Sequence, residues 1–108
     1  FGMLTGKYIN KKPKNARLTI WNRFDRYSNK NSKNVTLQYV EIAKKYDLTP
    51  TQLALSFVNQ QPFVASNIIG ATNLSQLKEN IESININLGE DVLKEIEVIH
   101  SNQPNPAP

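Results

Sequence analysis

Residues 68–80 read IIGATNLSQLKEN, and this stretch decides how the rest of the chain is interpreted. An apolar run ends at Gly70 and a helical pattern follows, which is typical of a strand that delivers a turn to a helix N-terminus. Asn73 predicts the N-cap of that helix, and Gln76 stands three positions later, as in a capping box. The free N–H groups and positive dipole end of such a turn attract phosphate. From these residues alone, a self-capped turn that binds no ligand remains the alternative.

The apolar run before this turn predicts the single strand of the chain. Pro62 and Gly70 bound a β-branched segment, and we expect a buried strand over residues 66–69 with both faces covered, as in a parallel sheet. A lone strand cannot form a sheet, so its neighbours must come from further chain or from another copy. The sequence also begins at Phe1 rather than Met, which is expected of a fragment or of a processed chain.

Apolar periodicity predicts helices over residues 35–46, 50–59, 74–84 and 90–100, with a shorter helical stretch near 19–27. Thr49 is the expected N-cap of the second helix, because a proline follows it and a glutamine stands three positions later. Residues 101–108 hold three prolines and should be extended. The side chains expected on buried helix faces are Val35, Tyr39, Ile42, Ala43, Tyr46, Leu53, Ala54, Phe57, Val58, Leu74, Leu77, Ile81, Ile84, Val92, Leu93, Ile96 and Ile99.

Basic residues are concentrated before position 34. Residues 1–33 carry a net charge of +8, whereas the remainder carries −4. This asymmetry indicates an anion-facing segment attached to an ordinary folded body. We expect a long loop here, with Trp21, Phe24 and Tyr27 as apolar anchors that argue against full disorder. A solvated basic loop and a nucleic-acid surface are the alternatives, although no nucleic-acid module is recognisable.

The composition excludes several classes of site. The 108 residues contain no cysteine and one histidine, which rules out disulfides, thiolate metal sites and a histidine cluster. No apolar run approaches the roughly 18 residues of a membrane span. No signal-peptide pattern is visible either. We therefore expect a cytoplasmic chain without a metal site and without a membrane partner.

A second stretch with phosphate-binding character lies at the start of the chain. Residues 2–8 read GMLTGKY, with two glycines around Lys7. The spacing does not match the Walker pattern, in which the lysine follows a glycine and precedes Ser or Thr. A lysine in a glycine-bounded loop can bind a phosphate, although on its own it is more often a solvated charge.

Together, residues 2–8, the pair Ala16-Arg17 and residues 68–80 resemble the C-terminal part of the aldo-keto reductases. The resemblance is closest to the Tas-like and potassium-channel β-subunit branches, and it covers essentially the whole chain. It implies an α/β fold, the (β/α)8 or TIM barrel, of which this chain is a C-terminal part that is mostly helical by itself. Residues 1–33 would form the basic loop over the cofactor, and 34–108 would supply helices and the last barrel strand.

The resemblance also implies a cofactor, NADP(H), and assigns residues to it. Lys7 and Arg17 would contact the pyrophosphate and the 2′-phosphate, and Phe1 would lie where the loop passes the pyrophosphate. Many family members carry Arg or Lys in place of Gln76, and glutamine keeps a hydrogen bond but loses that charge. The implied cofactor-binding residues are Gly2, Lys7, Arg17, Gly70, Thr72, Gln76, Glu79 and Asn80.

The implied activity is the NADPH-dependent reduction of aldehydes and ketones, with a small carbonyl compound as substrate of the complete protein. Family members protonate the nascent alkoxide with an Asp, Tyr, Lys and His tetrad from the N-terminal half of the barrel. No tyrosine of this chain, nor His100, stands in such a context. We therefore expect the chain alone to be inactive. The alternative function is a truncated, non-catalytic module that self-associates through exposed apolar faces.

Overall fold

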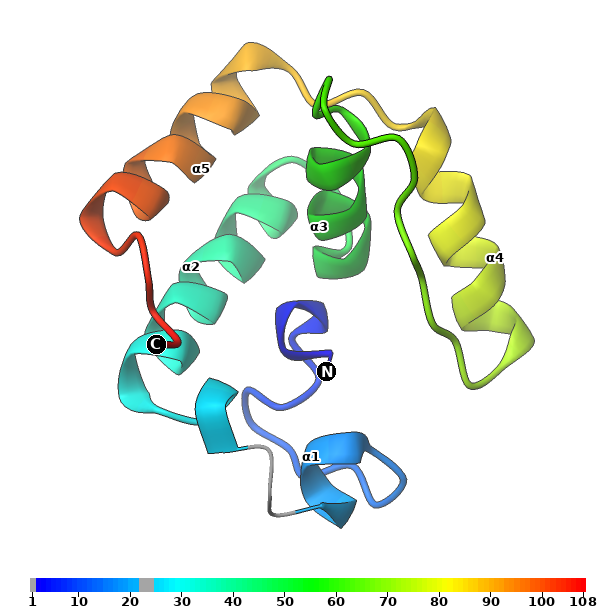
Figure 1. Cartoon of the computed structure of the whole chain (residues 1–108), viewed down its shortest axis with the longest axis vertical. Coiled ribbons are helices and arrows are strands. Elements are labelled where there is room, and N and C mark those ends of the chain that lie inside the picture. The colour runs from blue at the N-terminus through cyan, green and yellow to red at the C-terminus, as the bar shows by residue number, and fades with distance from the viewer. Residues whose placement is uncertain (1, 22–24) are drawn as a thin grey trace.

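The computed structural model describes residues 2–21 and 25–108, which form helices and connecting loops (Figure 1). Phe1 and Phe24, both named above, lie outside the described residues. The longer elements are α1 (Arg17–Ile20), α2 (Lys30–Lys45), α3 (Pro50–Asn59), α4 (Leu74–Glu82) and α5 (Glu90–Asn102). Short 3-10 helices are η1 (Met3–Thr5), η2 (Asp25–Tyr27) and η3 (Ser83–Asn85).

Helix α2 begins five residues before the expected start, because Asn29 caps it. The Asn29 side chain accepts a hydrogen bond from the Ser32 N–H at 2.9 Å. At the other end, Asp47 adopts a left-handed conformation with φ of 55°, which stops the helix as the sequence predicted. The last residues of the expected basic loop are therefore helical.

Helix α3 starts with the predicted capping box. The Gln52 N–H donates to Thr49 Oγ1 at 3.1 Å, and the Thr49 N–H donates back to Gln52 Oε1 at 2.8 Å. Pro50 occupies the first turn, where its missing N–H costs nothing. Both ends of the predicted helix over residues 50–59 are confirmed.

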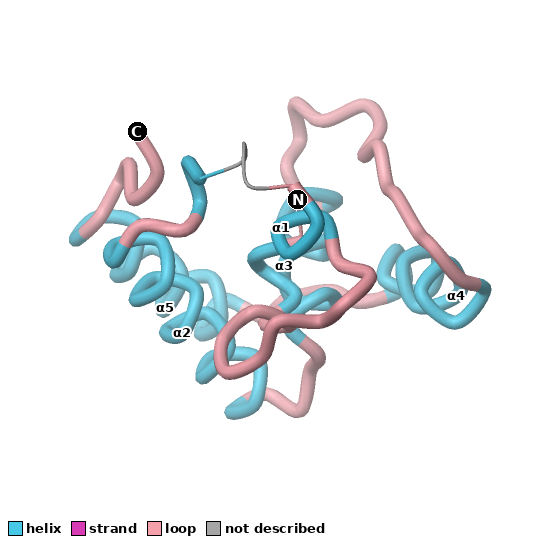
Figure 2. The backbone as a smooth tube through the Cα atoms, turned by 90° about the horizontal axis from the view of Figure 1, so that it is seen from below, coloured by secondary structure: helices cyan, strands magenta, loops and turns pink. Residues whose placement is uncertain are grey.

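Helices α2, α3 and α5 enclose the hydrophobic core. Figures 1 and 2 show α2 and α5 side by side, with α3 on the other side of α2 from α5. The predicted inner faces of these three helices are largely confirmed, with Tyr39, Tyr46, Phe57 and Leu93 partly buried against the core. The fully buried members of the core are Val35, Ile42, Ala43, Leu53, Leu88, Val92, Ile96 and Ile99.

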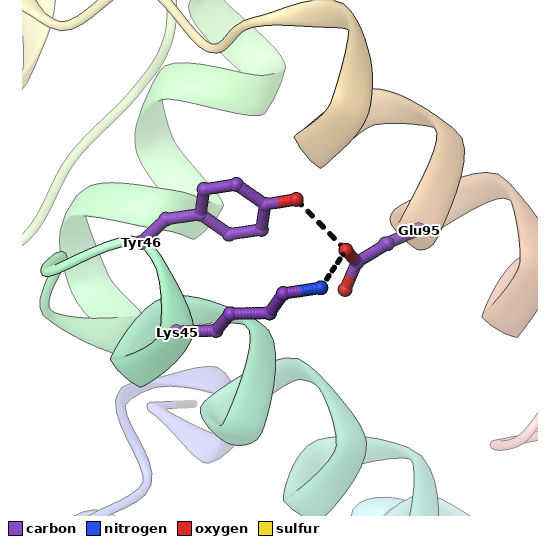
Figure 3. Close-up of polar contacts among 3 residues, drawn as sticks. All are labelled: Lys45, Tyr46 and Glu95. Atoms are coloured by element: carbon purple, nitrogen blue, oxygen red, sulfur yellow. Dashed lines mark hydrogen bonds and ion pairs between the residues drawn. The ribbon is translucent and has the colours of Figure 1, made fainter.

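A polar cluster joins α2 to α5 at the edge of this core (Figure 3). Glu95 Oε1 accepts hydrogen bonds from Lys45 Nζ at 2.5 Å and from the Tyr46 hydroxyl at 2.8 Å. These two donors hold the pKa of the Glu95 carboxyl below its usual value, whereas the carboxylate raises the pKa values of Lys45 and Tyr46. The cluster fastens the two helices at their exposed edge.

Helix α4 stands apart from the α2–α3–α5 core in both views. It contacts α3 and η3, yet none of its residues is buried. The expectation of a buried stripe over residues 74–84 is therefore wrong for this chain: Leu74 and Ile81 of α4 are 84% and 57% exposed, and Ile84 of η3 is 66% exposed. The stripe has the predicted helical spacing but has no apolar surface to cover it.

The expected strand over residues 66–69 does not form, and the structure assigns no strand in residues 2–21 and 25–108. The segment runs between α3 and α4 as irregular backbone, and Ile68 is 96% exposed. A strand needs a hydrogen-bonded neighbour, and the described residues offer none. The sequence indicated that a strand here would need partner strands from elsewhere. Because the described residues provide no such partner, the segment does not form a strand.

The C-terminal end of the chain returns to the start of α2. α5 extends to Asn102, and the residues beyond it turn back onto the start of α2. There the Ser32 hydroxyl donates to the carbonyl of Pro106 at 2.9 Å, and Arg26 Nε donates to that of Ala107 at 2.7 Å. The expected helix near residues 19–27 is represented by α1 and η2, and residues 22–24 between them lie outside the described residues.

Candidate functional site

The turn before α4 is held closed by its own side chains. Asn73 caps the helix by accepting a hydrogen bond from the Gln76 N–H at 2.9 Å. Gln76 Oε1 reaches back and accepts from both the N–H and the hydroxyl of Thr72, at 2.9 and 3.0 Å. The predicted cap at Asn73 is confirmed, whereas Gln76 bonds Thr72 rather than the Asn73 N–H, so only one half of the expected capping box forms. Two hydrogen-bond donors of Thr72 therefore converge on one oxygen.

Glu79 and Asn80 lie one turn further along α4 and make the contacts that place the helix. Asn80 Nδ2 donates to the carbonyl of Gly70 at 3.2 Å, which draws the turn toward α4. Glu79 Oε1 accepts from the hydroxyl of Thr49, the N-cap of α3, at 2.5 Å. Both side chains are only partly exposed. The sequence around Thr49 indicates only a helix cap, and no local pattern predicts its contact with Glu79.

The backbone conformation of the turn does not itself require a glycine at position 70. Its φ is negative or extended, and a Cβ placed on it would meet no atom within 4 Å. Glycine is used elsewhere where a positive φ or a close approach demands it. At Gly70 the structure presents open space in front of the turn.

The first loop wraps around its lysine. Gly2 has a φ of 86°, and the Lys7 side chain folds against it, with Nζ 2.8 Å from the place a Cβ would occupy. The Thr5 hydroxyl donates to the Gly2 carbonyl at 2.8 Å, closing η1. Lys7 Nζ also lies 5.2 Å from the centre of the Tyr8 ring, within cation–π range. The loop is compact and keeps the Lys7 ammonium exposed.

Arg17 is the first residue of α1 and is exposed. The hydroxyl of Tyr8 accepts a hydrogen bond from the Leu18 N–H at 3.2 Å. This bond joins the first loop to the helix that carries Arg17. The loop that carries Lys7 and the helix that carries Arg17 are thus linked through this contact.

An open cavity of about 580 Å³ lies between the two motifs. Gly2 and Thr5 line it from the first loop, while Gly70 and Asn80 line it from the α4 side. Lys7, Arg17, Thr72, Gln76 and Glu79 do not line this cavity. Of the eight assigned residues, three therefore share one cavity although they come from segments far apart in sequence.

Tyr39 of α2 also lines this cavity, although its helical spacing indicated only a core position. Partial burial, with the nearby Glu97 carboxylate, raises its pKa. The neutral form of the hydroxyl is therefore favoured.

Two further features are absent from the part of the chain that the structure describes. Within residues 2–21 and 25–108 no group of three or more His, Cys, Asp or Glu side chains could hold a metal ion. In the same part of the chain, every helix is too short or too polar to cross a membrane.

The sequence matches the aldo/keto reductase family model over residues 1–101, and the chain belongs to that family. It is 52% identical to the protein Tas of Escherichia coli K12 over 109 residues, which covers the whole chain but 32% of Tas. It is 32% identical to L-glyceraldehyde 3-phosphate reductase of the same strain, across 78% of the chain and 26% of that protein. A Schizosaccharomyces pombe protein named as a candidate voltage-gated potassium channel subunit beta is 30% identical across 91% of the chain and 30% of its own length.

The chain thus spans about a third or less of the length of these relatives. The family has the TIM-barrel fold and generally binds NADP(H), and a helical part with no strand in its described residues is compatible with part of that barrel. The expected family is confirmed. The assignment of individual residues to the cofactor stays a prediction.

Proposed function

We propose that this chain is the C-terminal NADP(H)-binding part of a cytoplasmic aldo-keto reductase that reduces small aldehydes or ketones with NADPH. The observation that carries the proposal is the cavity shared by the two motifs. Gly2 and Thr5 on one side and Gly70 and Asn80 on the other face the same space. A dinucleotide lying across that space would contact both motifs at once.

The turn at residues 70–76 supplies the chemistry for a phosphate. The N–H and hydroxyl of Thr72 already point at one acceptor oxygen, that of Gln76. A phosphate oxygen in that place would accept the same two hydrogen bonds, and it would be favoured by the N-terminus of α4. The open space in front of Gly70 lets the ligand approach the main chain.

Arg17 would supply the positive charge that Gln76 lacks. A hydrogen bond to a charged group contributes about 1.5–3 kcal/mol, so Arg17→Ala should weaken NADPH binding roughly 10- to 100-fold. NADH lacks the 2′-phosphate and should be little affected. Gln76→Arg should tighten NADPH selectively, because guanidinium binds phosphate through two hydrogen bonds.

The test is a calorimetric titration of NADPH and NADH into the complete protein that contains this chain. Lys12→Ala is the matched control, since Lys12 is an exposed cation of the same basic segment. An equal loss for both cofactors would make Arg17 a pyrophosphate or loop-closing residue. If Lys12→Ala lost as much NADPH affinity as Arg17→Ala, the effect would come from the overall positive charge of the segment and not from Arg17 itself. Intact mass of the native protein, expected near three times 12.3 kDa, tests whether the chain is one part of a barrel.

The family's catalytic tetrad has no counterpart that we can assign in this chain. We therefore propose that the 108 residues alone do not reduce carbonyl compounds, and that the rest of the barrel supplies the reacting groups. A second candidate function, a non-catalytic self-associating module, is favoured by the exposed stripe on α4. Leu74 and Ile81 present apolar surface that another copy could cover.

A further inference from the structure

The last residues of the chain are held by their main chain. Residues 103–108, which we call the tail, read QPNPAP and follow α5. The Ser32 hydroxyl donates to the carbonyl of Pro106 at 2.9 Å, and Arg26 Nε donates to the carbonyl of Ala107 at 2.7 Å. Proline has no N–H, so a proline-rich segment offers mainly carbonyl oxygens for hydrogen bonding. The two donors match that chemistry.

Both donors belong to one hydrogen-bond network at the start of α2. Asn29 Nδ2 donates to the carbonyl of Arg26 and to Ser32 Oγ, each at 3.0 Å. The same side chain caps α2 by accepting from the Ser32 N–H at 2.9 Å. Capping needs only that acceptor oxygen. The other bonds of the network are therefore not required by the cap, and they fix the two residues that hold the tail.

The tail also lines the cavity that the two candidate cofactor motifs share. Pro106 and Ala107 are half-buried and line that space together with Gly2 and Gly70. Arg26 belongs to the basic segment that precedes α2, and it lies 81 positions before its partner in the tail. This bond therefore fastens the basic segment to the other end of the chain, beside the cavity.

We infer that the tail is a clasp, which fastens the basic segment beside the cavity and opens before a dinucleotide enters or leaves. The inference rests on the proposed NADP(H)-binding function. The hydrophobic core is built from residues between Val35 and Ile99, so the tail can open without unpacking it. Arg26 is exposed, and breaking its bond and that of Ser32 releases the tail from α2.

Stopped-flow fluorescence of NADPH binding to the complete protein tests the clasp. Arg26→Met removes one donor to the tail. Ser32→Ala removes the other and keeps the backbone N–H that Asn29 caps. If the clasp must open in both directions, the association and dissociation rate constants should each rise by about fivefold per variant, as for one lost hydrogen bond. Kd should then stay near the parent value. Deleting residues 104–108 should raise both rate constants at least as much.

Lys30→Met is the matched control, because Lys30 is an exposed cation at the first position of α2. It removes the same charge as Arg26→Met and should leave both rate constants near those of the parent. Urea midpoints close to that of the parent should show that the core is intact in every variant.

Four outcomes would overturn the inference. If Lys30→Met changed the rate constants as much as Arg26→Met, the effect would come from charge alone. If only dissociation became faster and affinity fell in proportion, the tail would contact the ligand and would not gate it. If the deletion left both rate constants unchanged, the tail would have only a structural role. In these three cases the proposed function would still stand, whereas a parent protein that bound no NADPH would overturn both.

Discussion

The buried serine of α3 offers a sharp test of how the site is attached to the core. Ser56 is fully buried, and its hydroxyl donates to the carbonyl of Ser83 at 3.1 Å. Ser83 is also fully buried and belongs to η3, which directly follows α4. This bond therefore joins the core helix α3 to the end of the helix that carries the candidate site.

The expected loss of stability follows from the hydrogen bond and the packing that each substitution at Ser56 removes or changes. The Ser83 carbonyl also accepts from the Ile86 N–H at 3.2 Å, so Ser56→Ala leaves no unsatisfied acceptor. The loss should then be one neutral hydrogen bond, about 1 kcal/mol. Ser56→Val loses the same bond and also forces additional carbon into a fully buried position, where overpacking costs about 1–3 kcal/mol more. We expect the order parent, Ser56→Ala, Ser56→Val in decreasing stability.

Urea unfolding of the 108-residue chain, followed by far-ultraviolet circular dichroism, measures both values. With a slope of about 1–3 kcal/mol per M urea, Ser56→Ala should lower the midpoint by roughly 0.3–1 M. Ser101→Ala is the control, because the Ser101 hydroxyl bonds Glu97 on the exposed surface of α5. The reasoning fails if Ser56→Ala is as stable as Ser101→Ala, or if Ser56→Val is the more stable of the two buried variants.

Three further outcomes are expected. The pKa of the Glu95 carboxyl in the folded chain lies below its ordinary value of 4.5. The ionised carboxylate therefore stabilises the fold above pH 4.5, and this stabilisation is lost as the pH falls through the folded-state pKa. The urea midpoint of Glu95→Gln should therefore lie below that of the parent at pH 7 and coincide with it at pH 2. Gly70→Ala should leave the chain as stable or stabilise it by about 0.4–1 kcal/mol while weakening NADPH binding to the complete protein. Gly6→Ala, at φ of 74°, should destabilise the chain, and equal thermal midpoints for the two variants would contradict this. The isolated chain should form dimers or larger species by light scattering, and Ile81→Lys should shift it toward the monomer; a monomeric parent chain would contradict the self-association proposal.

Local signals were enough to predict the helices of the core. The Thr49 capping box marks the start of α3, and the spacing of Val35 and Ile42 marks the inner face of α2. Asn29 also fits the N-cap preference, but the basic composition around it led to the expectation of a loop. A cap residue therefore carries more information about a helix start than the charge of the segment that contains it.

Non-local structure could not be read from residue patterns in the same way. The residues around Ile68 have strand composition, yet a strand exists only where a second strand pairs with it. The apolar spacing on α4 is correct, but whether Ile81 is buried depends on apolar surface that the described residues do not provide. The contact between Thr49 and Glu79 is similar, because no local pattern indicates that a helix cap donates to another helix.

Helix α4 and the turn before it are attached to the core mainly by polar contacts. The rest of a barrel would add the apolar contacts that α4 lacks. The bonds of Ser56 to Ser83, Thr49 to Glu79 and Asn80 to Gly70 place α4 and its turn, while no residue of α4 is buried. Hydrogen bonds orient groups but contribute only about 1 kcal/mol each, whereas burying a large aliphatic side chain contributes about 1.5–3 kcal/mol. Covering the apolar stripe of α4 would therefore stabilise an arrangement that the polar contacts already specify.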